Sequence, residues 1–402
     1  DLETFFQLLY LYFTAPRYDE GAVARYLDQV RTSLRKQENS PEEQYARMIQ
    51  ETLKNAHPRS LPLTAERLSQ VNPQKAYAFY KAHVSRPDTF TFVFVGSVTP
   101  EELEPYLKRY LAVIPAAQPA SPPPGSAPGK GNLPYLWDSA AQPLYRTVTE
   151  RVGTLIDRGV RFRTEPIEKT LKAGKEPKSL VTLYFTGSWD WSLREMSYLN
   201  LLEDYLDIRL REVIREDKGG TYGVHVSITP RRAPVPEYSI EISFGTDPSR
   251  VGELLGILQE ELARLKRTPP LETEVAKIRE QRLRLVERGR KENGFYRYFL
   301  TQELYYQEVD RVQGRIEEAV KRADGSGQAL SGESSGRPEG KAETRGNDKG
   351  SMLTPISGTL FDLWEETARS LTPQMLQERI QKYFEESRML RFTLEPEDPS
   401  KG

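Results

Sequence analysis

The stretch LREVIREDKGGTYGVHVSI, residues 210–228, sets the fold class that we expect for this chain. It begins as the charged end of an amphipathic helix, passes Gly219 and Gly220, and becomes an alternating strand that begins at Tyr222. A helix that leads into a strand through two glycines is typical of a domain that mixes helices and sheet. The two residues that flank this turn, Arg215 and Tyr222, are the first candidates for a functional role.

Four stretches are predicted to be strands. SLVTLYFTG at 179–187 is the first of them, and the other three alternate residues as half-buried strands do. TYGVHVSIT at 221–229 and EYSIEISFG at 237–245 are predicted to pair as neighbouring strands. The fourth, TFTFVFV at 89–95, places three phenylalanines on one face: Phe90, Phe92 and Phe94.

Helices are predicted between these strands from apolar residues that recur at helical spacing and from capping residues. Ser192 and Glu195 form a capping box that opens a long helix, and Thr99 and Glu102 form another, with a proline in the first turn. The predicted helical ranges are 2–14, two helices within 20–55 that are separated near Asn39-Ser40-Pro41, 74–84, 99–111, 192–218, one that starts at Asp247-Pro248, and 271–310.

The chain contains an internal repeat. Asn72-Pro73-Gln74 and the phenylalanines at 90–94 have counterparts 300 residues later, in Thr372-Pro373-Gln374 and in Leu390, Phe392 and Leu394. Upstream, Pro16 pairs with Pro270 at an offset of 254, and extra sequence in the second copy takes up the difference. The alternative is that two unrelated domains share the same order of helix and strand.

The predicted fold class is therefore α+β, with two homologous modules that each pack helices on a mostly antiparallel sheet. Residues 1–114 form a partial module that lacks its front half, because nothing in it matches the strand, long helix and hairpin at roughly 145–250. A Pro/Gly-rich linker follows at 115–140, and 141–402 form the complete module. A low-complexity insertion at about 323–351 lacks the apolar residues needed to order itself and is expected to be mobile.

Composition excludes several classes of protein. The 57 Lys and Arg nearly balance the 58 Asp and Glu, so no global charge favours nucleic acid or an anionic membrane. Zero cysteines exclude disulfides, cysteine-ligated zinc and a thiol nucleophile, and they suit the cytoplasm and the periplasm equally. The longest apolar run, FFQLLYLYF at 5–13, is too short to span a membrane.

The common catalytic motifs are absent from the sequence. The three histidines, His57, His83 and His225, never lie three or four residues apart, so neither H-E-x-x-H nor its inverted form H-x-x-E-H is present. We therefore predict no metal site in this chain, and a structural role for each histidine. No G-x-S-x-G, phosphate-binding loop or dinucleotide-binding glycine motif occurs either.

Arg215 and Tyr222 remain as a pair with two interpretations. An arginine fork and a tyrosine hydroxyl beside flexible glycines could bind a peptide carbonyl and stabilise an oxyanion. In the structural interpretation, Arg215 pairs with Glu212 or Glu216 and Tyr222 is a packing residue. The residues alone favour the structural interpretation.

Several segments together resemble the pitrilysin/insulinase family of zinc peptidases, and in particular the third and fourth domains of its long bacterial members. The order of the segments carries this resemblance, which covers nearly all of the chain apart from the linker and the insertion. The segments are DLETFFQLLYLYFTAPRYDEGAV, HPRSLPLTAERL, FTFVFVGSVTPEELEPYLKRYLAVIP, PIEKTLKAGKEPKSLVTLYFTG and LREVIREDKGGTYGV.

The resemblance implies half of a clamshell metallopeptidase. In that family the first half holds zinc through H-x-x-E-H, and the last domain supplies an arginine and a tyrosine that reach the bound peptide. Arg215 and Tyr222 match that pair in position and spacing, which implies catalytic and substrate-binding roles: Arg215 on a backbone carbonyl and Tyr222 on the oxyanion. Zinc would be the cofactor of the complete enzyme, without any ligand from this chain.

The implied function is that of the carboxy-terminal half, or a partner subunit, of a zinc-dependent metalloendopeptidase that encloses and hydrolyses peptides or unfolded proteins. Its partners would be that substrate and the zinc-bearing amino-terminal half. One alternative is a non-catalytic homologue that serves as a scaffold or assembly subunit, and another is that the missing front of the first module carried the zinc motif. Similar proteins imply a periplasmic location, with the cytoplasm as the alternative.

Overall fold

The computed structural model describes residues 1–84, 87, 90–114, 157–215, 221–323 and 359–397. Within these residues the chain forms two compact units. One consists of residues 1–16, 80–114 and 296–323, and the other of 17–79, 157–295 and 359–397. The second unit holds the sheet and the candidate site.

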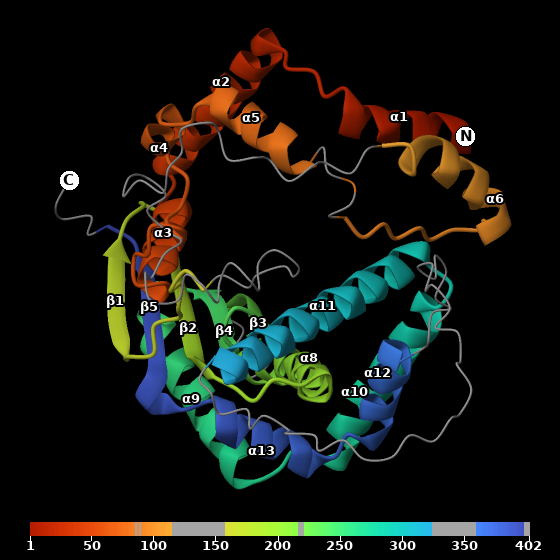
Figure 1. Cartoon of the computed structure of the whole chain (residues 1–402). Helices are drawn as coiled ribbons and strands as arrows, with labels where there is room; N and C mark the ends of the chain where they lie inside the picture. Colours follow the sequence, from red (N-terminus) through yellow and green to blue (C-terminus); the bar gives the residue numbers. More distant parts are fainter. Residues whose placement is uncertain (85–86, 88–89, 115–156, 216–220, 324–358, 398–402) are drawn as a thin grey trace, which may run out of the picture. The chain divides into compact units, whose positions relative to one another are not determined.

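A five-stranded sheet forms the centre of the second unit (Figure 1). Its order is β1-β5-β2-β4-β3; β1 and β5 run parallel, and the other neighbours run antiparallel. The strand predictions for 179–187, 221–229 and 237–245 are confirmed, and so is the mostly antiparallel α+β fold. The strands are β1 (Ile167–Lys172), β2 (Ser179–Ser188), β3 (Thr221–Arg231), β4 (Glu237–Thr246) and β5 (Met389–Glu395).

One face of the sheet is packed with helices α8 (Leu193–Arg215), α9 (Val251–Arg267) and α13 (Pro373–Tyr383). The residues of β4 that face these helices are almost completely buried, as its alternating sequence predicts, whereas β2 is buried on both faces from Val181 to Gly187. This is the main core of the unit. Its strand residues include Val181, Leu183, Phe185, Ile240, Ile242 and Phe244.

The opposite face is covered in part by helix α3 (Pro41–Leu53), which lies beside β1 and β5 in Figure 1. The Tyr45 hydroxyl donates to the carbonyl oxygen of Phe392 at 2.9 Å and lies 3.0 Å from Thr182 Oγ1. Tyr45 is 4% exposed, and Ile49 packs beside it against the sheet. Hydrogen bonds and apolar packing therefore attach α3, from the amino-terminal part of the chain, to the sheet of the carboxy-terminal part.

Helices α2 (Glu20–Glu38) and α3 confirm the predicted pair and its interruption. Asn39 is the C-cap of α2, and Ser40 caps α3, whose first residue is Pro41. The compact units therefore interleave along the sequence, since residues 17–79 group with the sheet. The division into homologous modules at 1–114 and 141–402 stays a prediction.

The capping box predicted for the long helix α8 is only half formed. The Glu195 N–H donates to Ser192 Oγ at 3.0 Å, as expected of an N-cap. The Glu195 carboxylate does not return to the Ser192 N–H. It accepts from the Tyr383 hydroxyl at 2.8 Å and pairs with Arg379, because α13 packs against the start of α8. A tertiary contact therefore replaces the second bond of the box.

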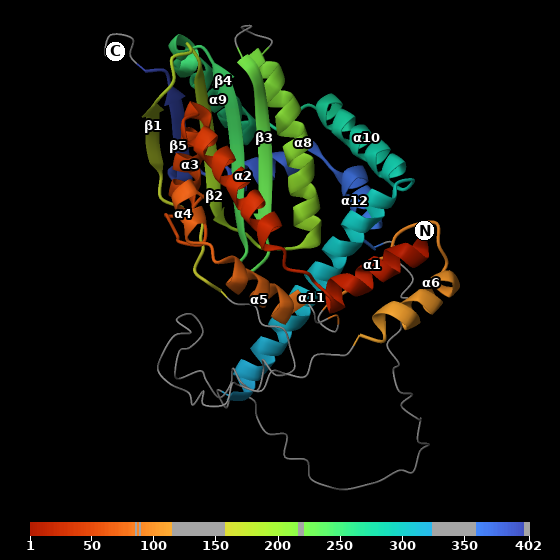
Figure 2. The same cartoon turned by 90° about the horizontal axis from the view of Figure 1, so that it is seen from above.

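The remaining helices of the second unit include α4 (Ala65–Ser69), α10 (Glu272–Gly289), α12 (Thr359–Ser370) and part of α5 (Pro73–Val84) (Figure 2). The predicted helical range 271–310 is confirmed as α10 followed by α11 (Asn293–Ala323), with a short break between them. Pro73 opens α5 and Pro373 opens α13, so the two helix starts lie 300 residues apart, but in the described residues the strand half of the repeat forms only at β5. The repeat itself stays a prediction.

The first unit contains α1 (Leu2–Thr14) and α6 (Pro100–Tyr106), which continues as η2 (Leu107–Leu111). The predicted helices at 2–14 and 99–111 are confirmed. Thr99 and Glu102 form the predicted capping box, in which the carboxylate accepts from the Thr99 N–H at 2.8 Å and the hydroxyl accepts from the Glu102 N–H at 3.3 Å.

The strand predicted at 89–95 is wrong for the residues that the structure describes there, 90–95, which belong to no sheet. A strand needs a neighbour for its N–H and C=O groups, and the described residues provide no paired strand for this segment. The phenylalanine face does pack: the Phe94 ring lies 5.7 Å from that of Phe6, and the Phe90 ring 5.3 Å from that of Phe13.

The predicted linker at 115–140 lies outside the described residues, and so does the predicted insertion at about 323–351 apart from Ala323. In the described part of the chain, none of the helices has the length and apolar character that crossing a membrane requires.

Candidate functional site

The predicted pair of residues lies at the corner between α8 and β3. Arg215 is the last residue of α8, and Tyr222 is the second residue of β3. Residues 216–220 and the side chains of Arg215 and Tyr222 lie outside what the structure describes. The backbone therefore places the two residues on either side of one connection, and their roles stay a prediction.

A β-bulge shapes the start of β3. Thr221 pairs with Thr246 and Val224 pairs with Phe244, so β3 carries one residue more than β4 between these pairs. Gly223 lies inside the bulge with φ +145°, a conformation that residues with side chains rarely adopt. A bulge increases local twist, and bulges are frequent next to active sites. The strict alternation of the sequence therefore does not extend across this position.

Acidic side chains of α8 hold the outer edge of β3. Glu203 Oε2 accepts a hydrogen bond from the Ile228 N–H at 2.9 Å, and Asp207 Oδ1 accepts from the Val226 N–H at 3.4 Å. Burial raises the pKa of the Glu203 carboxyl, and the hydrogen bond from Ile228 opposes that rise. These bonds fix the helix against the strand that follows the corner.

An ion-pair network anchors the carboxy-terminal part of α8 to α9. Arg209 Nε donates to Glu261 Oε1 at 2.7 Å, and Arg264 Nη2 donates to the same oxygen at 2.7 Å. Glu261 is 7% exposed. Burial alone would raise its pKa, but hydrogen bonds from Arg264 and Arg209 outweigh burial, so its pKa is lowered. A buried carboxylate with two guanidinium partners gives this part of α8 a fixed position.

A cavity of about 760 Å³ lies on the α3 side of the sheet and reaches the bulge. Its floor is formed by β2, β3 and β4, and α3 forms one wall. The wall is mainly apolar, whereas the floor includes several polar side chains. The floor residues are Leu180, Val181, Thr182, Tyr184, Gly223, Val224, His225, Glu241, Ser243, Phe244 and Gly245.

Tyr184 and Glu241 form a direct polar contact on this floor. They are cross-strand partners, and the tyrosine hydroxyl donates to Glu241 Oε2 at 2.7 Å. Burial raises the pKa of Tyr184 well above its usual range, and the neighbouring Glu241 charge raises it further. The tyrosine therefore stays protonated near neutral pH and remains a donor to the carboxylate.

The segment 157–163 packs beside Lys54, which lines one end of the cavity. The Phe162 N–H donates to Glu237 Oε1 at 3.2 Å, and Arg231, paired with Glu237, donates to the carbonyl oxygen of Val160 at 3.0 Å. Lys54 Nζ lies 2.9 Å from the centroid of the Phe162 ring. Burial, followed by repulsion from Arg231, lowers the pKa of Lys54 to about 8.

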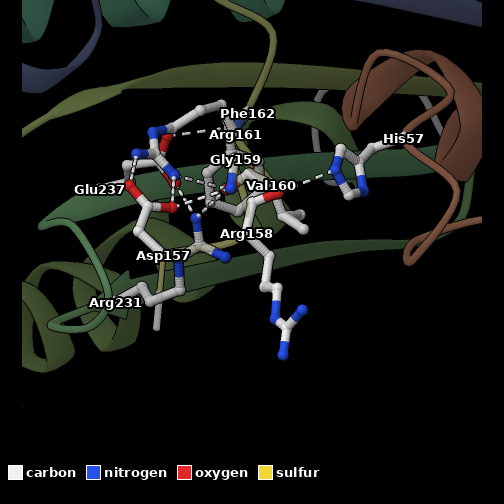
Figure 3. Close-up of polar contacts among 9 residues, drawn as sticks. All are labelled: His57, Asp157, Arg158, Gly159, Val160, Arg161, Phe162, Arg231 and Glu237. Carbon is white, nitrogen blue, oxygen red and sulfur yellow. Dashed lines mark hydrogen bonds and ion pairs between the residues drawn. The ribbon is translucent and has the colours of Figure 1, made fainter. Parts of the chain in front are cut away.

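His57 forms a hydrogen bond with the same segment, 157–163. Its Nε2 lies 3.0 Å from the carbonyl oxygen of Arg158 (Figure 3), and its Nδ1 accepts from the Arg59 N–H at 3.2 Å. Since Nδ1 accepts, Nε2 carries the hydrogen and donates to Arg158. Both ring nitrogens are therefore used in structural bonds, which leaves none for a metal ion or for proton transfer.

The described residues do not fit a metal centre. In the ranges that the structure describes, no three or more His, Asp or Glu side chains lie where they could hold a metal ion together. His83 lies in the last turn of α5, and His225 lies on the cavity floor beside Ser243, its cross-strand partner on β4.

The sequence predicted one part of this site and missed another. It singled out the α8–β3 corner, which the structure places at one end of the cavity through Gly223. It did not single out Tyr184 and Glu241. A signal was present, because Glu241 is a charged residue on the polar face of EYSIEISFG, between two serines of the same face.

Comparison with known proteins gives a family match over residues 70–282, more than half of the chain, to the model described as "Peptidase M16 inactive domain". The protein described as "Zinc protease PQQL-like" from Arabidopsis thaliana is 24% identical over 310 residues, which are 74% of this chain and 29% of that protein. A probable zinc protease PqqL from Haemophilus influenzae is 24% identical over 176 residues, 44% of this chain and 15% of its own length. The chain thus spans less than a third of these relatives.

Solved structures share the fold. The periplasmic protease PqqL from Escherichia coli has a TM-score of 0.64 at 17% identity, and the match covers 98% of this chain and 35% of that one. A peptidase M16 inactive domain from Pseudomonas fluorescens has a TM-score of 0.60 at 14% identity, and the match covers 99% of this chain and 77% of that one. These structures have the same α+β fold as this chain. The family match shows that the chain belongs to the peptidase M16 inactive-domain family.

Proposed function

We propose that this chain is the substrate-binding, carboxy-terminal half of a zinc-dependent metalloendopeptidase that encloses and hydrolyses peptides or unfolded proteins. The observation that carries the proposal is the α8–β3 corner, where a fixed helix meets a bulged strand beside a cavity. Family membership supports it, as do relatives named zinc proteases, of which this chain matches 29% or less.

In this proposal Arg215 donates to a backbone carbonyl of the bound peptide, and Tyr222 donates to the oxyanion of the tetrahedral intermediate. A guanidinium offers several donors in a fixed plane and keeps its charge at all working pH values. Tyr222 lies between Thr221 and Val224, both of which pair with residues of β4. Hydrogen bonds that form only as charge develops on the substrate raise the rate rather than ground-state binding.

Zinc belongs to the proposal only as a cofactor of the complete enzyme. The described residues of this chain offer no group that could hold it, so the zinc-bearing half, on the same parent chain or on a separate subunit, is the proposed partner. The periplasm is the proposed compartment, because the Escherichia coli structure of the same fold is described as a periplasmic protease.

The experiment is steady-state peptide hydrolysis by the complete enzyme that contains this chain, with Arg215→Ala and Tyr222→Phe. Each change is expected to lower kcat/KM about 100-fold, the usual cost of losing one donor to a developing oxyanion or of a misplaced substrate. Arg267→Ala and Tyr26→Phe are matched controls, because Arg267 is the last residue of α9 and Tyr26 is 66% exposed. Wild-type kcat/KM in both site variants contradicts the proposal.

A scaffold or assembly subunit is the second candidate function. It is favoured by the description of the matching family as an inactive domain. A scaffold makes no contact with a reacting peptide, so it predicts unchanged peptide hydrolysis for Arg215→Ala and Tyr222→Phe. The same measurement therefore separates the two functions.

A further inference from the structure

The cavity beside the corner holds a carboxylate that has no basic partner. Glu241 accepts a hydrogen bond from Tyr184, and within the described part of the chain it forms no ion pair with a lysine or arginine. Other acidic side chains of the same unit, such as Glu237 and Glu261, are paired with arginine. A carboxylate that is partly removed from water attracts a cation more strongly than one at the open surface.

The rest of the cavity suits an aliphatic stem. The wall from α3 contributes Ala46, Ile49 and Leu53, which face the polar floor across the cavity. A lysine or arginine side chain combines a methylene stem with a charged end, and it buries the stem along apolar surface while the charge reaches a polar partner. Tyr184 fixes the position of the carboxylate that such a charge would meet.

The lysine and the histidine that line the cavity lie away from Glu241 along the strands. Lys54 lies over the ring of Phe162, and the Phe162 N–H donates to Glu237. Glu237 is four residues from Glu241 along β4, a distance of about 14 Å. Lys54 is therefore near the Glu237 end of β4. His225 pairs with Ser243, which is nearer the bulge than Glu241. The carboxylate of Glu42 also lines the cavity, and its own basic neighbour is Lys178.

We propose that Glu241 and Tyr184 form a subsite that binds a lysine or arginine side chain of the substrate. The proposal rests on the proposed function, since the peptide must also be held at the α8–β3 corner. It names a substrate class: extended peptides with one basic residue at a fixed distance from the cleaved bond.

With the cleaved bond taken at the row of the bulge, the spacing of residues along β4 gives that distance. Gly245, in the row of the bulge, lies four residues from Glu241 along β4, which is about 14 Å. The stem of a lysine covers roughly 6 Å of this. The remainder, roughly 8 Å, corresponds to about two or three residues of extended peptide. The basic residue therefore lies about two or three positions from the bond held at the corner.

The test measures kcat/KM and Kd for the complete enzyme with peptides that place one lysine at each position near the cleaved bond, on both sides. Each peptide has a counterpart with methionine in place of lysine. We expect a preference for lysine at one position, about two or three residues from the bond. Glu241→Gln is expected to lower kcat/KM for that peptide about tenfold and to leave its methionine counterpart within about twofold.

Glu241→Lys is expected to reverse the preference, so that a glutamate peptide exceeds the lysine peptide. Glu260→Gln removes the same charge from an exposed position of α9 and is expected to change neither peptide. Equal kcat/KM and Kd for lysine and methionine peptides in the wild type, or an equal loss for both in Glu241→Gln, overturns the subsite.

The two proposals fail in different ways. If Tyr222→Phe and Arg215→Ala keep full activity while Glu241→Gln removes the lysine preference, the catalytic assignment is wrong and the basic side-chain site stands. If the corner variants lose activity and Glu241→Gln leaves the lysine preference intact, the catalytic assignment stands and the subsite is wrong.

Discussion

The two faces of the sheet use the same strands in different ways. On the face of α8, α9 and α13, Ile240 and Ile242 of β4 are completely buried. On the other face, the alternate residues Glu241 and Ser243 of the same strand line a cavity that α3 covers on one side. Because neighbouring residues of a strand point to opposite faces, one strand can stabilise the fold and also present polar groups to a ligand. Stability and recognition are therefore separable by substitution at adjacent positions.

The packed face is where a substitution costs the most stability. Ile242→Ala leaves a cavity in the core beneath the central strands, and we expect the free energy of unfolding to fall by about 2–5 kcal/mol. Ser243→Ala, one residue away on the cavity face, is expected to change it by less than about 0.5 kcal/mol. Urea denaturation of both variants checks this, and similar losses at the two positions contradict the separation of the faces.

A smaller loss is expected at the bulge where the cavity meets the corner. Gly223 has φ +145°, and a side chain there is strained even though nothing lies within 4 Å of the place where a Cβ would be. Gly223→Ala is expected to lower the free energy of unfolding by about 1–3 kcal/mol. Gly252→Ala is the matched control, since that glycine also has open space around it but lies in helix α9, where alanine is favoured. An unchanged thermal midpoint for Gly223→Ala would show that the bulge relaxes without cost.

The attachment of α3 to the cavity face comes next. Tyr45→Phe removes the hydroxyl that donates to the carbonyl oxygen of Phe392 and lies beside Thr182, and we expect a loss of about 1–2 kcal/mol in the free energy of unfolding. The exposed Tyr26→Phe is expected to have no measurable effect. If the two variants have equal stability in urea, the hydroxyl of Tyr45 does not hold α3 to the sheet.

A further effect is electrostatic and is seen only as pH changes. The pKa of Lys54 is lowered to about 8 in the folded chain, whereas the pKa of a lysine in an unfolded chain is about 10.4. Below about pH 8 both states hold the proton, and between about pH 8 and 10.4 only the unfolded state does. The contribution of Lys54 to the free energy of unfolding therefore rises with pH through this window.

Nuclear magnetic resonance of the lysine side chains checks this shift. Lys54 is expected to reach half titration near pH 8, whereas a lysine in water does so at about pH 10.4. A Lys54 midpoint equal to that of a lysine in water would mean that solvent reaches the amine at this end of the cavity.

The sequence predicted those elements whose signal is local. The strands at 221–229 and 237–245 alternate strongly, 179–187 is a short run of mostly apolar residues, and Ser40-Pro41 and Thr99-Pro100 mark helix starts by capping chemistry. The segments 90–95 and 389–395 show what a local pattern leaves undecided. In both segments large apolar residues alternate with other residues. In the described part of the chain, only 389–395, which is β5, has a strand on each side. A strand forms only where a partner strand is available.

The site was predictable only in part for a similar reason. The Arg215 and Tyr222 pair could be found from its place in a motif, because the two residues are close in sequence. Tyr184 and Glu241 are 57 residues apart, and α3 joins their cavity from a distant part of the chain. Their proximity depends on strand register and on where α3 packs, neither of which the local pattern contains.

The proposed function depends above all on the α8–β3 corner binding the reacting part of a peptide. The decisive measurement is the Kd of the complete enzyme and its Tyr222→Phe variant for a substrate peptide and for the matching phosphinate peptide, whose tetrahedral phosphorus imitates the intermediate. We predict that Tyr222→Phe weakens phosphinate binding about 100-fold and leaves substrate binding nearly unchanged, because the hydroxyl acts on the developing charge. Equal Kd values for the phosphinate in the wild type and the variant would contradict this role.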